Sequence, residues 1–262
     1  MALPRPYWAE MTALDFSTDT DGWVAVIPTA AIEQHGPHLP LGTDAIIAEG
    51  MVKTVVERLP EEVPASFLPV QSVGKSNEHI SYRGTITMSW DTAIKAWLEM
   101  ATSMVRADIR RFIFVNAHGG NTAMLDIIVR ELRVRFDVLA VHTAWSRFGD
   151  GNTLTDEERA YGIHGGTMET ALIQHFRPDL LRHEHVDTFQ SAQARVEADH
   201  TRLVIHGDHG FGWKAGDLNP NGVVGNAAAA TAEMGATIAR HQADGFIELL
   251  RDVAEIDLSV LK

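Results

Sequence analysis

The sequence contains no cysteine in 262 residues. Disulfides, thiolate nucleophiles and cysteine-ligated zinc sites are therefore excluded. Any metal ion that the protein binds must be held by the nitrogen and oxygen ligands of His, Asp and Glu. The chain is well supplied with these, because it has 13 histidines and 35 acidic residues.

Positive charge is also scarce, since 22 Lys and Arg residues face the 35 acidic ones and leave a net charge of −13 with histidine neutral. No basic run offsets this surplus, which disfavours nucleic acids and anionic membranes as partners. No stretch reaches about 18 consecutive apolar residues, and the first residues lack the basic segment and apolar core of a secretory signal. We therefore expect a cytoplasmic protein.

No linker-like stretch, internal repeat or low-complexity tract divides the chain, so we expect a single domain over residues 1–262. Apolar runs of strand length alternate with segments of helical period, which is typical of an α/β architecture with a parallel sheet. Ligand sites of such sheets collect at the carboxyl ends of the strands. The predicted strands lie at 23–28, 66–70, 111–116 and 137–143, and the crossover helices at 91–105 and 122–136.

Further helices are predicted in the second half of the chain. Residues 166–176 read as a short helix that Pro178 ends, and residues 226–256 as a long final helix that opens with an alanine run. Gly235 and Gly245 are possible points of interruption in that helix. The turn-rich stretch 206–216 is placed on a loop over the active-site face.

Residues 33–44, EQHGPHLPLGTD, place two carboxylates and two imidazoles directly after an apolar run. These groups suit Zn, Mn or Fe, and a carboxylate such as Asp44 can bridge two ions. Two glycines and two prolines forbid a helix here, so the donors are expected on a shaped loop. A surface loop with two histidines and no metal is the alternative.

The segment NAHGGN, residues 116–121, follows the predicted strand 111–116, so His118 would project from a strand end. Gly119 and Gly120 would let the backbone approach a ligand closely, and the helix start behind them favours an anion. The alternative is a histidine in a tight strand–helix turn without a ligand.

Two weaker signals come from other histidines. His164 precedes a helix whose first turn carries Glu169, a place where the helix dipole favours a carboxylate. Beside a metal, Glu169 would serve as a ligand or base and His164 as a proton shuttle. His79 stands next to Glu78, and a substrate contact and a surface pair are equally good readings of that pair.

Together these segments resemble the creatininase, or creatinine amidohydrolase, family. The matching pieces follow the family's order over nearly the whole chain, and the first of them is highly specific. They are residues 33–41 with Asp44, Glu78 and His79 with 84–86, 116–121, 164–166 with Glu169 and Thr170, and 222–225.

The resemblance implies a compact α/β/α fold, usually assembled as a homohexamer, that holds two divalent metal ions per chain. Zn is the first expectation for these ions, with Mn or Fe as alternatives. By the same resemblance, Glu33 and His118 would hold one ion, His35 would hold the other, and Asp44 would bridge them. His164 matches the proton-transfer histidine.

Departures from the family pattern carry information. Gly120 stands where creatininase has a metal-ligating glutamate, and we expect Glu169 to replace that ligand. Asn226 stands where the family usually has an acidic residue, and its side-chain oxygen would still cap the last helix. Trp145 is a candidate for closing over a flat substrate, and a core aromatic is an equally good reading. His38 is expected to support the loop instead of binding metal.

The sequence thus predicts a hydrolase that cleaves a C–N bond of a small cyclic amide, creatinine or a related lactam, with a metal-activated water. Deformylation of a formamide and trimming of a cofactor-precursor peptide are alternatives within the family. A non-catalytic metal-binding assembly protein is the alternative outside it. A two-metal phosphoesterase is disfavoured, because only Lys75, Arg83 and Lys214 lie near the candidate loops.

Overall fold

Four parallel strands form the central sheet of the computed structural model, which describes residues 3–261. Their spatial order is β2-β1-β3-β4. All four predicted strands are confirmed, β3 with its predicted bounds and the others with ends displaced by a few residues. The strands span β1 Val24–Thr29, β2 Ala65–Phe67, β3 Arg111–Asn116 and β4 Leu139–Ala144.

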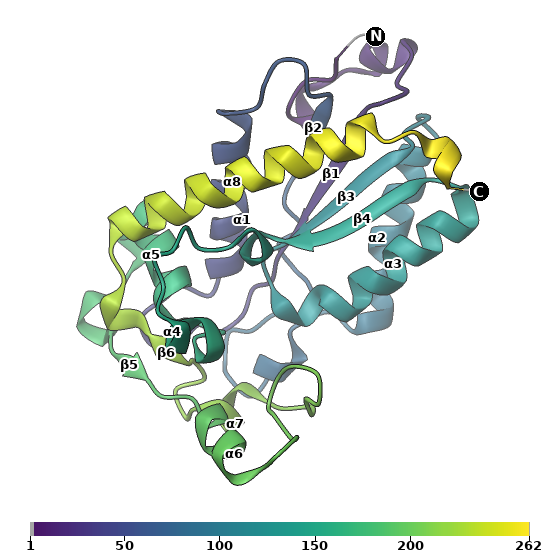
Figure 1. Cartoon of the computed structure of the whole chain (residues 1–262). Helices are drawn as coiled ribbons and strands as arrows, with labels where there is room; N and C mark the ends of the chain where they lie inside the picture. The colour runs from purple at the N-terminus through teal and green to yellow at the C-terminus, as the bar shows by residue number, and fades with distance from the viewer. Residues whose placement is uncertain (1–2, 262) are drawn as a thin grey trace.

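Helices cover both faces of this sheet, as Figure 1 shows. Successive side chains of a strand point to opposite faces, so Val26 and Val115 enter one apolar core while Ile27 and Phe114 enter the other. The expected three-layer α/β/α fold with a parallel sheet is therefore confirmed. The first core is covered by α1 Thr43–Val56, α5 Thr167–Phe176 and α8 Ala232–Glu255, the second by α2 Trp90–Val105 and α3 Thr122–Phe136.

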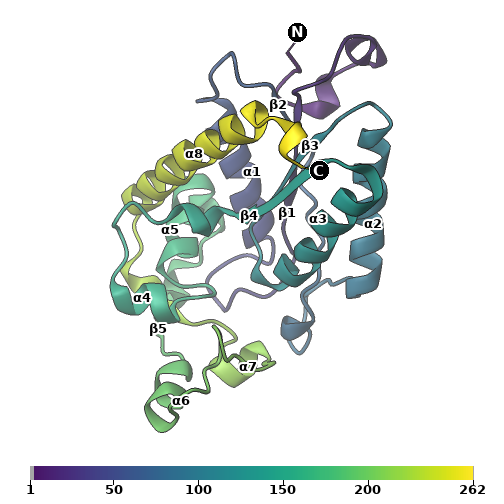
Figure 2. The ribbon, with the colours of Figure 1, turned by 45° about the vertical axis from the view of Figure 1, so that its right-hand side comes forward.

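The carboxyl ends of the strands meet at one edge, since Thr29 pairs with Asn116 and Asn116 with Ala144. The remaining α-helices and strands lie beyond that edge, at the end of the molecule opposite the two termini (Figure 2). They are α4 Asp156–Tyr161, α6 Gln193–Asp199, α7 Ala215–Leu218 and the antiparallel pair β5 Thr188–Phe189 and β6 Gly225–Asn226. Within residues 3–261, no helix has the length and apolar character needed to cross a bilayer.

Helix α1 corrects one expectation about residues 33–44. The chain from 33 to 42 is not helical, as its prolines and glycines predict, but α1 begins at Thr43. Asp44 therefore lies in the first turn of a helix and not on the loop. The helix is hard to recognise because its buried side carries the polar Thr43 and Asp44, while the apolar Ile46 and Val56 lie off that side, so its apolar residues give no clear helical period.

The final helix, α8, starts later than predicted. The alanines Ala227–Ala229 form a 3-10 turn instead of the first helical turn. Thr231 caps the helix, since its hydroxyl oxygen accepts the Met234 N–H at 3.2 Å. The capping role expected for Asn226 is thus wrong, because Asn226 lies in β6.

Neither glycine of α8 interrupts it. A β-carbon at Gly235 would overlap the carbonyl oxygen of Ala171 in α5, and one at Gly245 would press on the ring of Phe148. The two glycines therefore permit close packing of α8 against its neighbours and do not mark breaks in the helix.

Candidate metal centre

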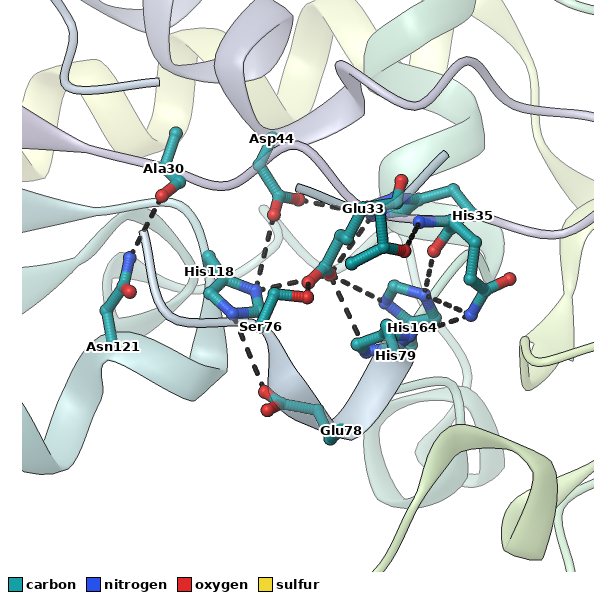
Figure 3. A network of polar contacts seen from close by, with 12 residues as sticks. Ala30, Glu33, His35, Asp44, Ser76, Glu78, His79, His118, Asn121 and His164 are labelled. Carbon is teal, nitrogen blue, oxygen red and sulfur yellow. Dashed lines mark hydrogen bonds and ion pairs between the residues drawn. The ribbon is translucent and has the colours of Figure 1, made fainter. Parts of the chain in front are cut away.

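Four buried polar side chains gather where β1 and β3 end (Figure 3). Glu33 and His35 lie on the loop after β1, Asp44 opens α1, and His118 follows β3. Each is at most 5% exposed. The topology thus brings together the residues in which the sequence predicted metal ligands.

Asp44 stands between two sets of donor atoms. Its Oδ1 lies 3.1 Å from Nε2 of His35, and its Oδ2 lies 3.3 Å from Nδ1 of His118. The same His118 nitrogen is 3.2 Å from Oε1 of Glu33. Each carboxylate oxygen of Asp44 therefore faces a different histidine, which is the arrangement of a bridging ligand.

Backbone carbonyls fix the orientation of both histidine rings. His35 donates its Nδ1–H to the carbonyl oxygen of Glu33 at 3.2 Å, and His118 donates its Nε2–H to that of Lys75 at 2.9 Å. A carbonyl oxygen can only accept, so in the neutral form of each ring the remaining nitrogen carries its lone pair toward Asp44. Metal-binding histidines are commonly oriented in this way.

Two atoms of this group, Nε2 of His35 and Oδ2 of Asp44, are buried without a hydrogen-bond partner. Orphaned polar atoms are rare in protein interiors, and an unseen ion is one of their explanations. Donor atoms of Glu33, His35 and Asp44 also lie within 4.8 Å of one another. The residues therefore fit divalent ions that prefer nitrogen and oxygen ligands, such as Zn, Mn and Fe.

The charges of the group support cation binding. Burial alone would lower the pKa of His35, but Asp44 raises it well above 6.5, and the pKa of His118 is raised likewise against burial by Glu33 and Asp44. Burial would raise the pKa of Asp44, but the same two histidines lower it. The carboxylates therefore favour the protonated form of both imidazoles. A metal ion would compete with these protons for the lone pairs of the ring nitrogens.

Glu169 reaches the same centre from the first turn of α5. Its Oε2 lies 3.7 Å from Nε2 of His35 and accepts the Gly165 N–H at 2.5 Å. Burial would raise the pKa of Glu169, but His35 beside it lowers it. His35, Glu169 and His164 form a second group whose donor atoms lie within 4.8 Å of one another.

His164 and His79 form the other side of the centre and are both buried. The His164 ring lies 4.2 Å from that of His35 and 4.3 Å from that of His79, centroid to centroid. Glu33 Oε1 is 3.6 Å from Nδ1 of His164 and 3.7 Å from Nε2 of His79. Burial, followed by the charge of a neighbouring histidine, lowers the pKa of both rings, that of His79 to about 2.

Two polar residues at the centre, Ser76 and Gln34, are absent from the sequence predictions of the site, and Glu78 appears there only as the neighbour of His79. Ser76 donates its hydroxyl to Glu33 Oε2 at 2.5 Å, and Gln34 contacts both His79 and His164. Glu78 lies 3.6 Å from Nε2 of His118 and pairs with Lys75 at 2.8 Å. Gln34 and Glu78 lie inside the quoted motifs, which is the signal that points to them, whereas Ser76 lies outside those motifs.

Close neighbours explain the glycine at position 120. A β-carbon built on Gly120 would overlap Oε1 of Glu78 and Nε2 of His118 and would lie 2.8 Å from the carbonyl oxygen of Lys75. The space that a side chain at 120 would need is thus already taken by two side chains and a backbone group.

His38 and Trp145 lie outside the donor groups described above. His38 places Nε2 3.0 Å from the Gly165 carbonyl oxygen and 3.1 Å from the Thr170 hydroxyl, and it stacks on Phe189. Burial lowers its pKa to about 4, so it is a neutral support of the loop. Trp145 is buried, packs on Phe246 at 4.9 Å and lines the cavity, so its predicted substrate contact stays a prediction.

A cavity of about 1140 Å³ opens above the centre. Glu33, His118, His164 and Glu169 lie in its wall. The 206–216 stretch contributes rim residues, as predicted for a loop over this face. These rim residues are His206, Phe211, Gly212 and Trp213.

Comparison with known proteins places these features in context. The family model described as "Creatininase: Creatinine amidohydrolase" matches residues 9–250. A mycofactocin precursor peptide peptidase of Mycobacterium ulcerans (strain Agy99) is 31% identical over 229 residues, which cover 85% of this chain and 82% of the relative. The creatinine amidohydrolase of Pseudomonas putida is 27% identical over 171 residues, which cover 60% of this chain and 66% of the relative.

Solved structures of creatininases share the fold. A creatininase variant described as Zn-Zn type has a TM-score of 0.75 at 20% identity, with 97% of this chain and 100% of that one covered. A creatininase described with Mn has a TM-score of 0.74 at 21% identity and the same coverage. Creatininases of this fold thus carry Zn or Mn.

Proposed function

The chain belongs to the creatininase family of hydrolases, and from that premise we propose that it is a metal-dependent amidohydrolase that cleaves a C–N bond of a peptide. The observation that carries the metal dependence is Asp44, whose two oxygens face His35 and His118 at 3.1 and 3.3 Å in a buried site. A shared carboxylate between two oriented imidazoles suits a pair of divalent ions.

Each ion of the pair has a candidate set of ligands. Glu33 and His118 would hold one ion, His35 and Glu169 the other, and Asp44 would be shared. Glu169 suits this role because its Oε2 lies 3.7 Å from Nε2 of His35. What such ions supply when bound is Lewis acidity at a carbonyl oxygen and a water of lowered pKa.

His164 is the proton carrier in this proposal. It donates its Nε2–H to the main-chain carbonyl oxygen of Gln34 at 2.9 Å, so its Nδ1 carries the free lone pair. Burial, followed by the charge of His35, lowers the pKa of His164 and keeps the ring neutral. Nδ1 can then take a proton from the attacking water and pass it to the leaving nitrogen.

The cavity favours a peptide over a small ring. Its volume of about 1140 Å³ exceeds the range of roughly 300–1000 Å³ that is typical of pockets for drug-sized ligands. A ring of creatinine's size would leave most of that space empty. The relative named as a peptide peptidase is also more similar to this chain than the one named creatinine amidohydrolase.

A cyclic amide is the second candidate, and the aromatic residues of the cavity favour it. Trp145, Phe211 and Trp213 all line the space and offer flat apolar surfaces on which a planar ring could stack. Creatinine, another lactam or a formamide would then be the substrate. A phosphate ester is a poorer candidate, because Lys75 is already paired with Glu78 at 2.8 Å.

The test combines metal content with three classes of substrate. The protein is loaded with Zn²⁺ or Mn²⁺, its metal is counted by mass spectrometry, and it is assayed on mixed short peptides, on creatinine and other lactams, and on formamides. We expect about two ions per chain and release of an amine from peptides.

Two outcomes would change the proposal. A metal-replete protein that turns over none of the three classes would overturn it and support the non-catalytic reading. If the protein hydrolyses lactams but not peptides, the second candidate, a cyclic-amide hydrolase, is the correct assignment. The expected homohexamer is tested separately, by light scattering on the purified protein.

A further inference from the structure

The side chain of Gln34 is held in one orientation by two backbone groups. Its Nε2 donates to the carbonyl oxygen of Gly222 at 2.6 Å, and its Oε1 accepts the Gly36 N–H at 3.0 Å. A carbonyl can only accept and a backbone N–H can only donate, so the nitrogen and oxygen of the amide cannot be exchanged. Gln34 is itself buried beside the centre.

This orientation determines which nitrogen of His79 carries hydrogen. The amide Nε2 of Gln34 lies 2.7 Å from Nδ1 of His79. Because that amide nitrogen gives one hydrogen to the Gly222 carbonyl oxygen, its second hydrogen is left for His79. Nδ1 therefore accepts, and the neutral ring carries its hydrogen on Nε2. That N–H faces Glu33 Oε1 at 3.7 Å, and His79 lines the cavity.

Gln34 hydrogen-bonds to His164 through its main chain instead of its side chain. The main-chain carbonyl oxygen of Gln34 accepts the Nε2–H of His164 at 2.9 Å, which leaves the lone pair on Nδ1. The 3.4 Å contact between Nε2 of Gln34 and Nε2 of His164 brings two donors together and is not a hydrogen bond. The two histidines thus turn a donor and an acceptor toward the same carboxylate, Glu33.

We propose that Gln34 is a positioning residue that assigns opposite roles to the two cavity histidines. Through its side chain it holds His79 as an N–H donor for the carbonyl oxygen of the scissile amide. Through its main chain it holds His164 as the proton acceptor. The role of His79 rests on the proposed amide hydrolysis.

One consequence concerns metal binding. Donor atoms of Glu33, His79 and His164 lie within 4.8 Å of one another and could be taken for a third metal group. A ring whose Nε2 keeps its hydrogen cannot bind an ion through that atom. His79 is thus a hydrogen-bond donor and no metal ligand.

The first experiment reads the hydrogen positions directly. Histidine rings are labelled with ¹⁵N in the zinc-loaded protein, and long-range ¹H–¹⁵N spectra distinguish the two neutral forms. His79→Gln and His164→Gln identify the two rings by the signals that they remove. We expect Nε2–H on both rings in the wild type. Gln34→Met removes the side-chain contacts with Gly222, Gly36 and His79 and keeps the main-chain carbonyl that bonds to His164, so only the His79 signal should change. Nδ1–H on His79 in the wild-type protein would overturn the proposal.

The second experiment measures metal and turnover. Gln34→Met should lower kcat on the order of 10- to 100-fold and change KM by less than about threefold, as loss of an oriented donor predicts. Gln193→Met is the matched control, because Gln193 is another buried glutamine, in α6, whose Nε2 bonds to Glu197. This control should keep wild-type kcat.

His79→Gln completes the test, because it should bind as much zinc as the wild type. Loss of an ion in that variant would make His79 a ligand and overturn the inference, even if Gln34→Met failed to fold. The proposed function fails by a different result, a wild-type protein without amide turnover. In that case the spectra still show whether Gln34 determines which ring nitrogen of His79 carries the hydrogen.

Discussion

The buried metal centre, called the floor here, and the rim of the cavity, formed by His206 and residues 211–213, are built in different ways. On the floor, His35 and His118 are nearly inaccessible, and a backbone carbonyl orients each ring. On the rim, Phe211 is 41% exposed and belongs to a turn-rich loop. Side chains that must be placed accurately are thus buried, while those that meet a substrate first are exposed to solvent and lie on a loop. The difference assigns the chemistry to the floor and the choice of substrate to the rim.

Asp44→Asn should have the largest effect, because it removes the carboxylate that both floor histidines face. We expect loss of bound metal together with a fall in kcat on the order of 10³-fold or more. The control is Asp126→Asn, which breaks a 2.8 Å Asp–His contact on the exposed side of α3. The metal content and the turnover of this control should equal those of the wild type. A fully metallated Asp44→Asn protein would contradict the assignment.

His164→Asn should separate the two tasks within the floor. The variant should keep its metal and lose activity by about 10²- to 10⁴-fold, the usual contribution of a positioned acid or base. Metal content and kcat are measured on the same sample. Near-normal turnover would remove His164 from the mechanism, and loss of an ion would make it a ligand.

Glu169→Gln should have an intermediate effect. Because Glu169 approaches His35 from α5, we expect one ion to bind roughly 10- to 100-fold more weakly while the other stays. Titration with a metal indicator would show one weakened step. Two unchanged steps would make Glu169 a base and not a ligand.

Phe211→Ala should have the smallest effect and reports on the rim. We expect KM to rise by about three- to tenfold with kcat and metal content unchanged, since uniform binding is lost. Leu203→Ala is the control, because Leu203 is also exposed, at 42%, and does not line the cavity. A fall in kcat for Phe211→Ala alone would show that the rim takes part in the chemistry.

The sequence predicts elements well where the apolar pattern is local. Helix α3 has its predicted bounds, because its buried residues, such as Leu125 and Ile128, recur at helical spacing. Helix α1 escapes prediction because polar residues lie on its buried side and apolar residues lie off it, which leaves no clear helical period. The start of α8 is placed too early, because alanine favours helix while the capping hydroxyl of Thr231 decides where the helix begins.

The candidate site divides in the same way. The predicted ligands Glu33, His35 and His118 are recognisable because they follow strand ends, and Asp44 because it completes the first motif at the start of α1. Gln34 lies inside the first motif, but its role is not recognisable there, since that role comes from contacts with Gly222 and His79 that are distant in sequence. Such supporting residues become visible only when the fold brings their partners together.

The overlap between Gly120 and Glu78 makes these two positions epistatic. The creatininase pattern carries a carboxylate at position 120, whereas here Glu78 fills that volume next to His118. A glutamate introduced at 120 alone would place two carboxylates in one space. Shortening residue 78 would relieve only the overlap with Glu78, because Nε2 of His118 and the Lys75 carbonyl oxygen also lie too close, and it would leave Lys75 without its partner. We therefore expect a glutamate at position 120 to require both a shorter residue at 78 and a displacement of the His118 ring.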